Sequence, residues 1–407
     1  MDTKGSNQSL VKVTNQALIV KEVRAKKRVS RSELAKLLQL SNPSISKHVD
    51  ALIAKGLVVE TGSLMTDVGR RPIMLEFNGK HGCVAVVDMS SNDCRICIAD
   101  LHGNKLEYSR VEGGQIITGA VLERIISTLK EMVGNIGDRC GQLLGICIGA
   151  PAVVEPKTGK IHWSARIENY DNVDLCGMFK NAFGVPIIVK NDINLAVVGE
   201  QIFGAGGNVD NMMYISIDAG VGQSVIIGGE LYEGLRGVAC DLGVLLPCVD
   251  EVLDIEAPPG RQYLPYILER TMSIYHLVDN VKARFSDGRD TVMRDWVSDV
   301  DDITYDDIVK AYGMGDPMVV PIVRRFAKGV AIIVKNMASL FDVDLILLGG
   351  VVAKLGSSFL NEILNTLANL PGYAKVNLKL SKLFDTAVIF GGIETTTQYI
   401  IEKIIDE

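Results

Sequence analysis

Hydrophobic residues between positions 30 and 60 recur at the spacing of two short amphipathic helices. In the first segment these residues are Leu34, Leu37, Leu38 and Leu40, and in the second they are Ile45, Val49, Leu52 and Ile53. Gln39-Leu40-Ser41 reads as the turn between the helices, with Ser41 as the cap of the second helix and Gly56 as its end. Leu57-Val58-Val59 then begins a β-hairpin. This pattern predicts a winged helix-turn-helix.

The second helix of this motif carries small polar residues and a lysine on the face that its apolar residues leave to solvent. These residues are Asn42, Ser44, Ser46, Lys47 and His48. Such a face suits the DNA major groove, where short side chains reach base edges and a lysine reaches phosphates. An ordinary helical hairpin with a solvated outer face is the alternative reading.

The wing should carry a second DNA contact. Arg70 and Arg71 lie in Gly69-Arg70-Arg71-Pro72 at the far end of the predicted hairpin. Two arginines on a segment constrained by glycine and proline could enter a minor groove. The same segment could also be a solvated linker.

Charge separates the predicted DNA-binding segment from the rest of the chain. Residues 1–78 carry 13 Lys and Arg against 7 Asp and Glu, a net charge of +6, whereas the whole chain of 407 residues carries −7. Residues 79–407 therefore carry −13. A basic module fused to an acidic body is what phosphate attraction by the N-terminal segment requires.

The composition indicates in which compartment the protein acts and whether it holds a cofactor. No run of about 18 apolar residues predicts a transmembrane helix, and the polar start MDTKGSNQSL lacks the apolar core of a signal peptide. The eight cysteines are scattered, and several lie in apolar, strand-like segments such as Gly145-Ile146-Cys147-Ile148-Gly149, which favours buried thiols over disulfides or a metal site. We therefore expect a cytoplasmic protein that has no cofactor.

Beyond residue 80, short apolar strands alternate with amphipathic helices in two similar halves. Strands are predicted at 81–88, 95–100, 105–108, 143–148, 186–190, 213–217, 224–227 and 345–348, and helices at 118–134, 194–203 and within 260–340. The pattern predicts an α/β body of two lobes with a ligand cleft. We expect domains at 1–80, at 81–198 completed by a C-terminal helix at 391–407, and at 199–390.

Several motifs, in order and spacing, give the chain a resemblance to the ROK family of repressors, open reading frames and kinases. The motifs are the winged segment, Gly149-Ala150-Pro151, Asn191-Asp192-Ile193-Asn194, Asp218-Ala219-Gly220-Val221-Gly222 and Leu347-Leu348-Gly349-Gly350-Val351. The resemblance covers nearly the whole chain. It implies an actin-like, sugar-kinase (ribonuclease H-like) body behind a DNA-binding domain, and regulators that respond to sugars.

The resemblance also implies that sugar phosphorylation is lost. Asp192 matches the family's catalytic base, although Asn191 and Asp192 could equally cap the following helix. The family's phosphate turn, Asp-x-Gly-Gly-Thr, is here Asp88-Met89-Ser90-Ser91-Asn92, and its second loop begins with Asp218. Side chains in place of glycines and a carboxylate beside a triphosphate both oppose nucleotide binding. We read Asp192 as a vestigial base.

The family's structural zinc site is also altered. Its Glu-x-Gly-His becomes Asp241-Leu242-Gly243-Val244, and its cysteine stretch becomes residues 260–269, which contain no cysteine. A structural zinc ion takes about four ligands, so we expect no metal. Asp241 could instead bind a sugar hydroxyl or pair with Arg236.

The leading hypothesis is a homo-oligomeric transcriptional repressor of carbohydrate uptake or catabolism genes, bound to a double-stranded operator. Its body would bind a sugar or sugar phosphate through Asn169, Asn191, Asp192 and Asp241. One recognition helix reads little sequence, so two-fold pairing on a palindromic site is expected. An active sugar kinase that retains a DNA-binding domain is the alternative. A third possibility is a body that only holds the oligomer together.

Overall fold

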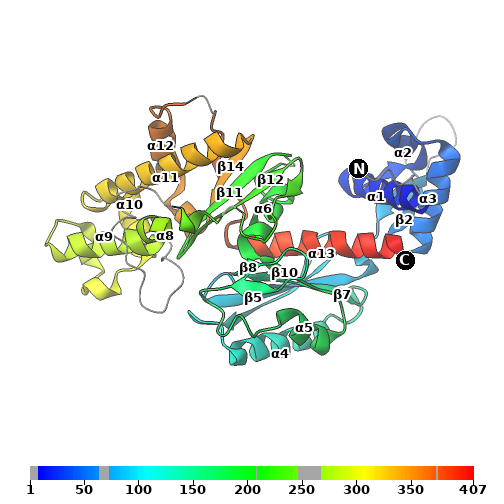
Figure 1. Cartoon of the computed structure of the whole chain (residues 1–407), viewed down its shortest axis with the longest axis horizontal. Helices are drawn as coiled ribbons and strands as arrows, with labels where there is room; N and C mark the ends of the chain where they lie inside the picture. Colours follow the sequence, from blue (N-terminus) through cyan, green and yellow to red (C-terminus); the bar gives the residue numbers. More distant parts are fainter. Residues whose placement is uncertain (1–7, 64–72, 208, 240, 246–266, 373–374) are drawn as a thin grey trace. The chain divides into compact units, whose positions relative to one another are not determined.

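The structure is a computed structural model that describes residues 8–63, 73–207, 209–239, 241–245, 267–372 and 375–407 (Figure 1). The chain divides into two compact units. The first contains Met1–Ile148, Asp174–Val189 and Gly392–Glu407, and the second contains Gly149–Val173 and Lys190–Gly391. Residues 149–173 and 190–198, which we expected in the first lobe, thus group with the second unit. Among the described residues, no helix is long and apolar enough to cross a membrane.

The N-terminal part of the first unit is a winged helix-turn-helix, as predicted. Its elements are α1 (Gln8–Lys26), β1 (Val29–Ser30), α2 (Arg31–Leu38), α3 (Asn42–Ala54), β2 (Val58–Ser63) and β3 (Ile73–Phe77). The three strands form a sheet in the order β1-β3-β2. Ser30 caps α2 in a capping box with Glu33, and Gln39 ends α2 in the left-handed conformation with φ 53°. The tight turn before α3 follows from that cap.

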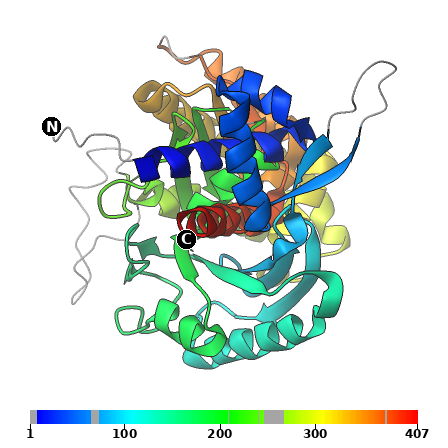
Figure 2. The ribbon, with the colours of Figure 1, turned by 90° about the vertical axis from the view of Figure 1, so that its right-hand side faces the viewer.

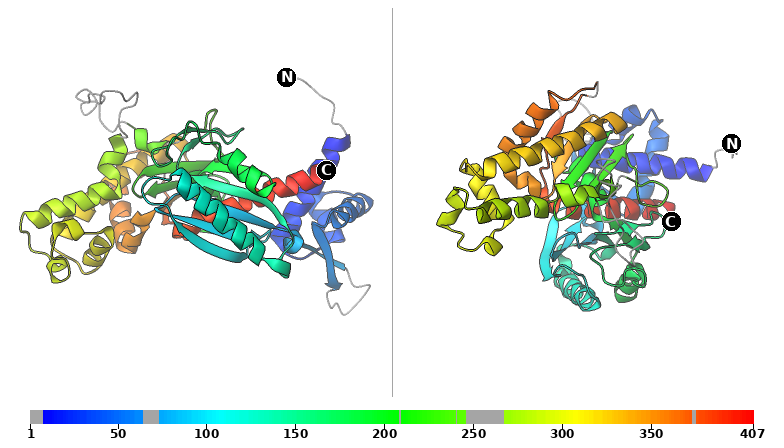
Figure 3. Two further views of the ribbon diagram at one scale, coloured as in Figure 1. Left: turned by 90° about the horizontal axis from the view of Figure 1, so that it is seen from below. Right: turned by 60° about the vertical axis from the view of Figure 1, so that its left-hand side comes forward.

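The rest of the first unit is built on a five-stranded sheet. Its strands are β4 (Cys83–Asp88), β5 (Asp93–Asp100), β6 (Lys105–Glu112), β7 (Leu143–Ala150) and β10 (Ile187–Asn191), in the order β10-β7-β4-β5-β6. The helices α4 (Gly119–Asn135) and α5 (Leu175–Phe183) cover one face, and α13 (Ala387–Asp406) lies along the other (Figures 1 and 3). Every residue of β4 is buried, because both faces of the sheet are covered.

The second unit repeats this plan around another five-stranded sheet. Its strands are β11 (Met212–Ile217), β12 (Val221–Ile227), β13 (Glu230–Leu231), β14 (Leu345–Gly349) and β15 (Leu378–Leu380), in the order β13-β12-β11-β14-β15. An antiparallel hairpin of β11 and β12 is extended by the parallel strands β14 and β15. A small ribbon pairs β8 (Val153–Val154) with β9 (Ile161–Trp163).

Helices complete the second unit. They are α6 (Asp192–Ile202), α8 (Ile267–Met272), α9 (Ile274–Ser286), α10 (Tyr305–Gly313), α11 (Val319–Phe341) and α12 (Gly356–Leu367). α6 packs on β11 and β12, and the insertion of α8 to α11 shares one apolar core with the sheet. Two sheets of the same plan, each with its own helices, confirm the predicted α/β body.

Candidate nucleic-acid interface and ligand site

The helix α3 presents the predicted DNA-binding residues at its N-terminal end. The hydroxyl of Ser41 accepts a hydrogen bond from the amide of Ser44 at 3.4 Å and so caps the helix, and Pro43 lies in the first turn. Asn42 and Lys47 are exposed, and Ser44 and Ser46 are half-buried. A capped helix end with short polar side chains can approach DNA phosphates and base edges closely.

One residue expected on this face lies elsewhere. His48 is buried, with 9% of its surface exposed, and burial lowers the pKa of its imidazole. The other buried residues of α3 are Ile45, Val49 and Leu52. His48 is therefore part of the domain core and not of the polar face.

Arg31 ties together the elements that would meet DNA. Its guanidinium pairs with Asp50 on α3 at 2.6 Å and with Glu60 on β2 at 2.5 Å. One side chain at the start of α2 thus fixes the recognition helix relative to the base of the wing. Sequence reasoning missed Arg31, because its partners come from two other elements and no periodic pattern marks them.

The hairpin of β2 and β3 forms the wing (Figure 2). At its base, Arg28 pairs with Glu76 at 2.7 Å, and Glu76 accepts a hydrogen bond from Thr61. Arg70 and Arg71 lie outside the described residues. Their role in DNA binding stays a prediction.

In the first unit, the turn that would cradle phosphate in a kinase is occupied by an internal ion pair. Asp88 is fully buried, and its carboxylate lies 2.7 Å from the guanidinium of Arg95, which is also buried. Arg95 also donates to the hydroxyl of Ser90 at 2.9 Å, and the amide of Ser90 donates to Asp88 at 2.9 Å. The polar groups of this turn are therefore bonded to one another.

The second phosphate loop is held by carboxylates of the chain itself. The amide of Val221 donates to Glu269 at 3.3 Å, and the amide of Val351 donates to Asp218 at 3.3 Å. A Cβ on Gly220 would lie 3.1 Å from the carboxylate of Glu269. Glu269 thus lies directly over the loop, where an incoming phosphate would meet a like charge.

Burial sets the protonation of the carboxyl groups near this loop. It raises the pKa of Glu269 above its ordinary value, and the neighbouring Asp241 raises it further. Burial also raises the pKa of Asp241. The ion pair with Arg236, left open by the sequence, does not form between these two described residues.

Asn191 is the last residue of strand β10, and Asp192 is the first residue of the helix α6 that follows it. Asn191 accepts a hydrogen bond from the amide of Asn194 at 3.1 Å, so it is the cap of α6, and its amide group donates to the carbonyl of Ala152 at 3.1 Å. Asp192 follows as the first residue of α6 and is 7% exposed. The capping role that the sequence suggested is confirmed for Asn191. Ligand binding by the pair stays a prediction.

The loops that carry Asn169 and Asp241 are attached to the same region of the second unit. The hydroxyl of Ser164 donates to the carbonyl of Pro151 at 2.9 Å, and Asn169 is exposed with φ 51°. On the other loop, Glu233 pairs with Lys190, next to Asn191, at 2.7 Å.

The loop that leads to Asp241 packs closely against the strand β8. A Cβ on Gly237 would lie 1.9 Å from the carbonyl oxygen of Val154, so only glycine fits there. The loops bearing Asn169 and Asp241 are thus bonded to, or packed on, residues that adjoin Asn191. Binding of one effector by Asn169, Asn191, Asp192 and Asp241 together stays a prediction.

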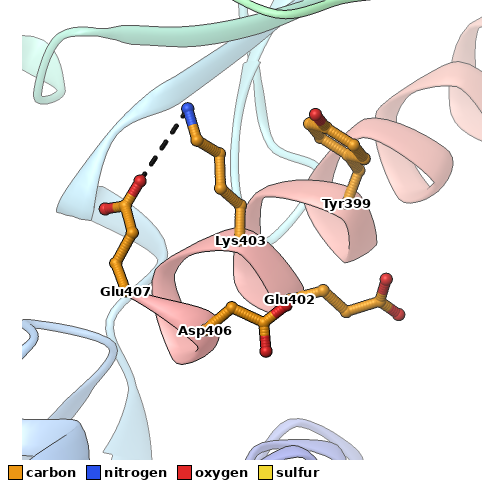
Figure 4. Close-up of a pocket in the computed structure, with 5 residues that line it drawn as sticks. All are labelled: Tyr399, Glu402, Lys403, Asp406 and Glu407. Atoms are coloured by element: carbon orange, nitrogen blue, oxygen red, sulfur yellow. Dashed lines mark ion pairs between the residues drawn. The ribbon is translucent and has the colours of Figure 1, made fainter.

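A pocket of about 370 Å³ lies elsewhere, along the end of α13 (Figure 4). Its lining residues are Tyr399, Glu402, Lys403, Asp406 and Glu407. Three of these five are acidic, and Lys403 pairs with Glu407 at 3.9 Å. None of the four predicted effector-binding residues lines this pocket.

Within the described residues, no three His, Cys, Asp or Glu side chains converge as metal ligands would. Cys248 and most of residues 260–269 lie outside the described residues, as does the side chain of Val244. The expected absence of a structural zinc ion therefore stays a prediction.

Comparison with known families assigns both parts of the chain. A model described as "Winged helix-turn-helix DNA-binding" matches residues 15–59, and a model described as "ROK family" matches residues 84–254 and 281–396. The second match spans both five-stranded sheets. These matches define a winged helix-turn-helix joined to a ROK body. The chain belongs to the ROK family, as its motifs indicated.

Relatives match either nearly the whole chain or more than half of it. The chain is 26% identical over 393 residues to the xylose repressor of Caldicellulosiruptor bescii, which covers 95% of this chain and 96% of that protein. It is 31% identical over 241 residues to the xylose repressor of Bacillus subtilis, covering 58% of this chain and 62% of that protein. It is also 24% identical over 237 residues to the transcriptional dual regulator NagC of Escherichia coli, covering 58% of each.

Solved structures share the fold. A ROK family transcriptional regulator, described as a homolog of the Escherichia coli MLC protein, superposes with a TM-score of 0.79 over 97% of this chain and 98% of that chain, at 22% identity. A ROK family glucokinase from Streptomyces griseus superposes with a TM-score of 0.63 over 77% of this chain and 99% of that chain, at 24% identity.

Proposed function

We propose that this protein is a DNA-binding transcriptional repressor of carbohydrate uptake or catabolism genes. The observation that carries the proposal is a capped recognition helix, α3, within a domain of the DNA-binding winged class, on a body similar along its length to a xylose repressor. The excess of basic residues in the first 78 positions supports a DNA partner. Such a protein acts in the cytoplasm and pairs as a homo-oligomer on a palindromic operator.

The body serves this repressor as a sensor and not as a kinase. Glu269 holds an amide of the second phosphate loop, Asp218 at the start of that loop holds the amide of Val351, and Arg95 pairs with Asp88 in the first turn. These contacts support a body that does not bind nucleotide, because phosphoryl transfer depends on backbone amides and cations aimed at the phosphates. The relatives named as xylose repressors also favour a sensor over a kinase.

The effector we propose is a sugar or sugar phosphate bound by the second unit. Asn169, Asn191, Asp192 and Asp241 would accept or donate hydrogen bonds to its hydroxyl groups. The contacts of these loops with Pro151, which precedes Ala152, and with Lys190, which precedes Asn191, support a common site. Xylose and N-acetylglucosamine are the first sugars to test, since relatives are named for them.

The experiment is a selection of duplexes from a randomised pool by the purified protein, followed by a mobility-shift titration with the selected duplex. We expect a palindromic sequence, and a change of its affinity when one sugar of the panel is added. Failure to enrich any sequence above the input pool would contradict the proposed repressor function.

A coupled ADP-release assay on the same preparation tests the kinase alternative. Pentoses, hexoses and amino sugars should give no turnover above background. Turnover that Asp192→Asn abolishes would instead establish a working kinase, because that aspartate occupies the position of the family's base.

A further inference from the structure

The C-terminal helix α13 belongs to both units. Residues 387–391 lie in the second unit and residues 392–406 in the first. The boundary falls between Gly391 and Gly392. A Cβ on Gly391 would lie 1.8 Å from the carbonyl oxygen of Leu195 on α6, and a Cβ on Gly392 would lie 2.6 Å from the side chain of Val86 on β4. Two adjacent glycines therefore let one helix pack tightly against an element of each unit.

The first half of α13 is bonded to the winged helix-turn-helix, whose helices lie beside α13 in Figure 2. Arg24, near the end of α1, makes a bidentate pair with Glu394 at 2.9 and 2.7 Å. Both side chains are mostly buried, with 22% and 15% of their surface exposed. The guanidinium also lies 5.4 Å from the ring centroid of Phe77 on β3. A partly buried bidentate pair of this kind holds two elements in one geometry.

A second bond involves the recognition helix itself. Lys55 is the residue that ends α3, and its ammonium donates to the carbonyl of Ile404 at 2.5 Å and to that of Ile405 at 3.1 Å. These carbonyls belong to the last turn of α13, where a helix leaves acceptors unpaired and favours a positive charge. The lysine at the end of α3 thus donates hydrogen bonds to two carbonyls in the last turn of α13.

The other end of α13 meets the helix that begins at Asn191 and Asp192. Besides Gly391, a Cβ on Gly199 of α6 would lie 2.2 Å from the carbonyl of Ala387. Backbone packs on backbone at both places, so no flexible side chain lies between the two helices to absorb a shift. A displacement of α6 must therefore displace the start of α13.

We propose that α13 is the element that couples the ligand site to the recognition helix, with Arg24 and Lys55 as the residues that position α3. This rests on the proposed function, since it concerns how that ligand site controls DNA binding. Ligand contact at the first turn of α6 shifts α13, and the bonds made by Glu394 and by the carbonyls of the last turn carry the shift to α1 and α3. Coupling of this kind is reciprocal, so DNA binding must change α6.

Reciprocity makes the proposal testable without knowledge of the effector. Hydrogen–deuterium exchange of the full chain is compared with and without the duplex selected from the randomised pool. We expect DNA to change exchange in α3, in residues 398–406 of α13 and in residues 191–202 of α6. In Glu394→Gln and in Lys55→Met the change in α6 is lost, whereas the change in α3 persists.

Matched variants separate coupling from folding. Glu402→Gln lies on the exposed face of the same helix, where its carboxylate bonds only to Gln398 among the contacts described, and should leave every response intact. The charge exchange Arg24→Glu with Glu394→Arg should restore the α6 response lost in either single change. If Glu394→Gln fails to fold, Lys55→Met provides the same comparison.

The outcomes distinguish the two proposals. Absence of DNA binding by the unaltered protein would remove the repressor function and the coupling with it. DNA binding with no change in α6, or with an α6 response retained in both Glu394→Gln and Lys55→Met, would overturn the role of α13 and leave the repressor function standing.

Discussion

Lys47 is an exposed cation on α3, and Arg71 is the residue of the wing expected beside it at the DNA. Replacing both with alanine should weaken binding of the selected duplex and flatten its dependence on salt. Each phosphate contact that is lost lowers the slope of log K against log salt by about one. Mobility-shift titrations at several salt concentrations measure both effects.

The control for this pair is Lys180→Ala, an exposed lysine on α5 of the body. It removes positive charge without touching the winged domain, so its slope should match that of the unaltered chain. Equal affinity and equal slope in the Lys47→Ala, Arg71→Ala double variant would remove these two residues from the interface.

Glu269 gives a residue-scale prediction in pH. Burial raises the pKa of this carboxyl above its ordinary value of 4.5, so folding disfavours the charged form at neutral pH. The raised pKa in the folded state means that stability is fully present below the unfolded pKa and is lost as pH rises through the folded pKa. Glu269→Gln keeps an acceptor for the amide of Val221 and removes the charge. It should therefore raise the melting temperature at neutral pH.

The gain should shrink as the pH falls towards the ordinary pKa of the carboxyl, where the native side chain is itself neutral. Thermal unfolding of both proteins across this pH range measures the difference. A difference in melting temperature that stays constant with pH would show that burial of the charged Glu269 carboxylate does not destabilise the folded chain.

At the scale of elements, the contact between α13 and α6 predicts that one added methyl group lowers the stability of the folded chain. Gly391→Ala would place a Cβ 1.8 Å from the carbonyl of Leu195, so one helix must move. Overpacking of this kind costs about 1–3 kcal/mol. Gly134→Ala is the matched control, because its Cβ meets nothing within 4 Å on an exposed face of α4.

An alanine in place of an exposed helical glycine stabilises by about 0.5–1 kcal/mol. The two substitutions are chemically identical and should shift the melting temperature in opposite directions. A stable Gly391→Ala protein with an unchanged melting temperature would show that the packing of α6 on α13 is looser than the structure indicates.

The elements that sequence predicted share one property, which is that their signals are local. The capped α3, its turn and the apolar runs of β4 and β5 each depend on residues within a few positions of one another. α1 was not predicted, although Ile19, Val20 and Val23 are buried. Its apolar residues are interrupted by polar ones such as Gln16, which is buried as well, so its pattern does not show a clean helical stripe.

For the whole molecule, the test of the ligand site is a melting shift. A sugar that binds only the folded chain stabilises it by about 2.7 kcal/mol at a concentration one hundred times its Kd. Asp192→Ala should abolish the shift produced by the active sugar, because a site built on hydroxyl hydrogen bonds loses affinity when one group is left unpaired. DNA binding without ligand should stay nearly unchanged.

Asp174→Ala offers a comparison, since this aspartate also caps a helix, α5, away from the predicted ligand residues. It tests whether loss of any helix-terminal carboxylate weakens the melting shift. If no sugar or sugar phosphate shifts the unaltered protein, or if Asp192→Ala responds equally, a body that only holds the oligomer together becomes the better account.

The sequence by itself determined the class of the N-terminal domain, the two-lobed α/β body, and the presence of Asn191 and Asp192 at a strand-to-helix junction. These features depend on periodicity and on hydrogen bonds between near neighbours, such as the bond from Asn194 to Asn191. The ROK motifs gave the order of the parts, because each motif is a short contiguous segment.

Only the tertiary structure decided what these parts touch. The bond from Val221 to Glu269 joins residues 48 positions apart, and the pair of Arg24 with Glu394 joins residues 370 positions apart. No local pattern specifies such partners, because charged side chains on exposed and buried faces look alike in sequence. Packing of whole elements brings them together, and it is this packing that places carboxylates on the phosphate loop and ties α13 to the recognition helix.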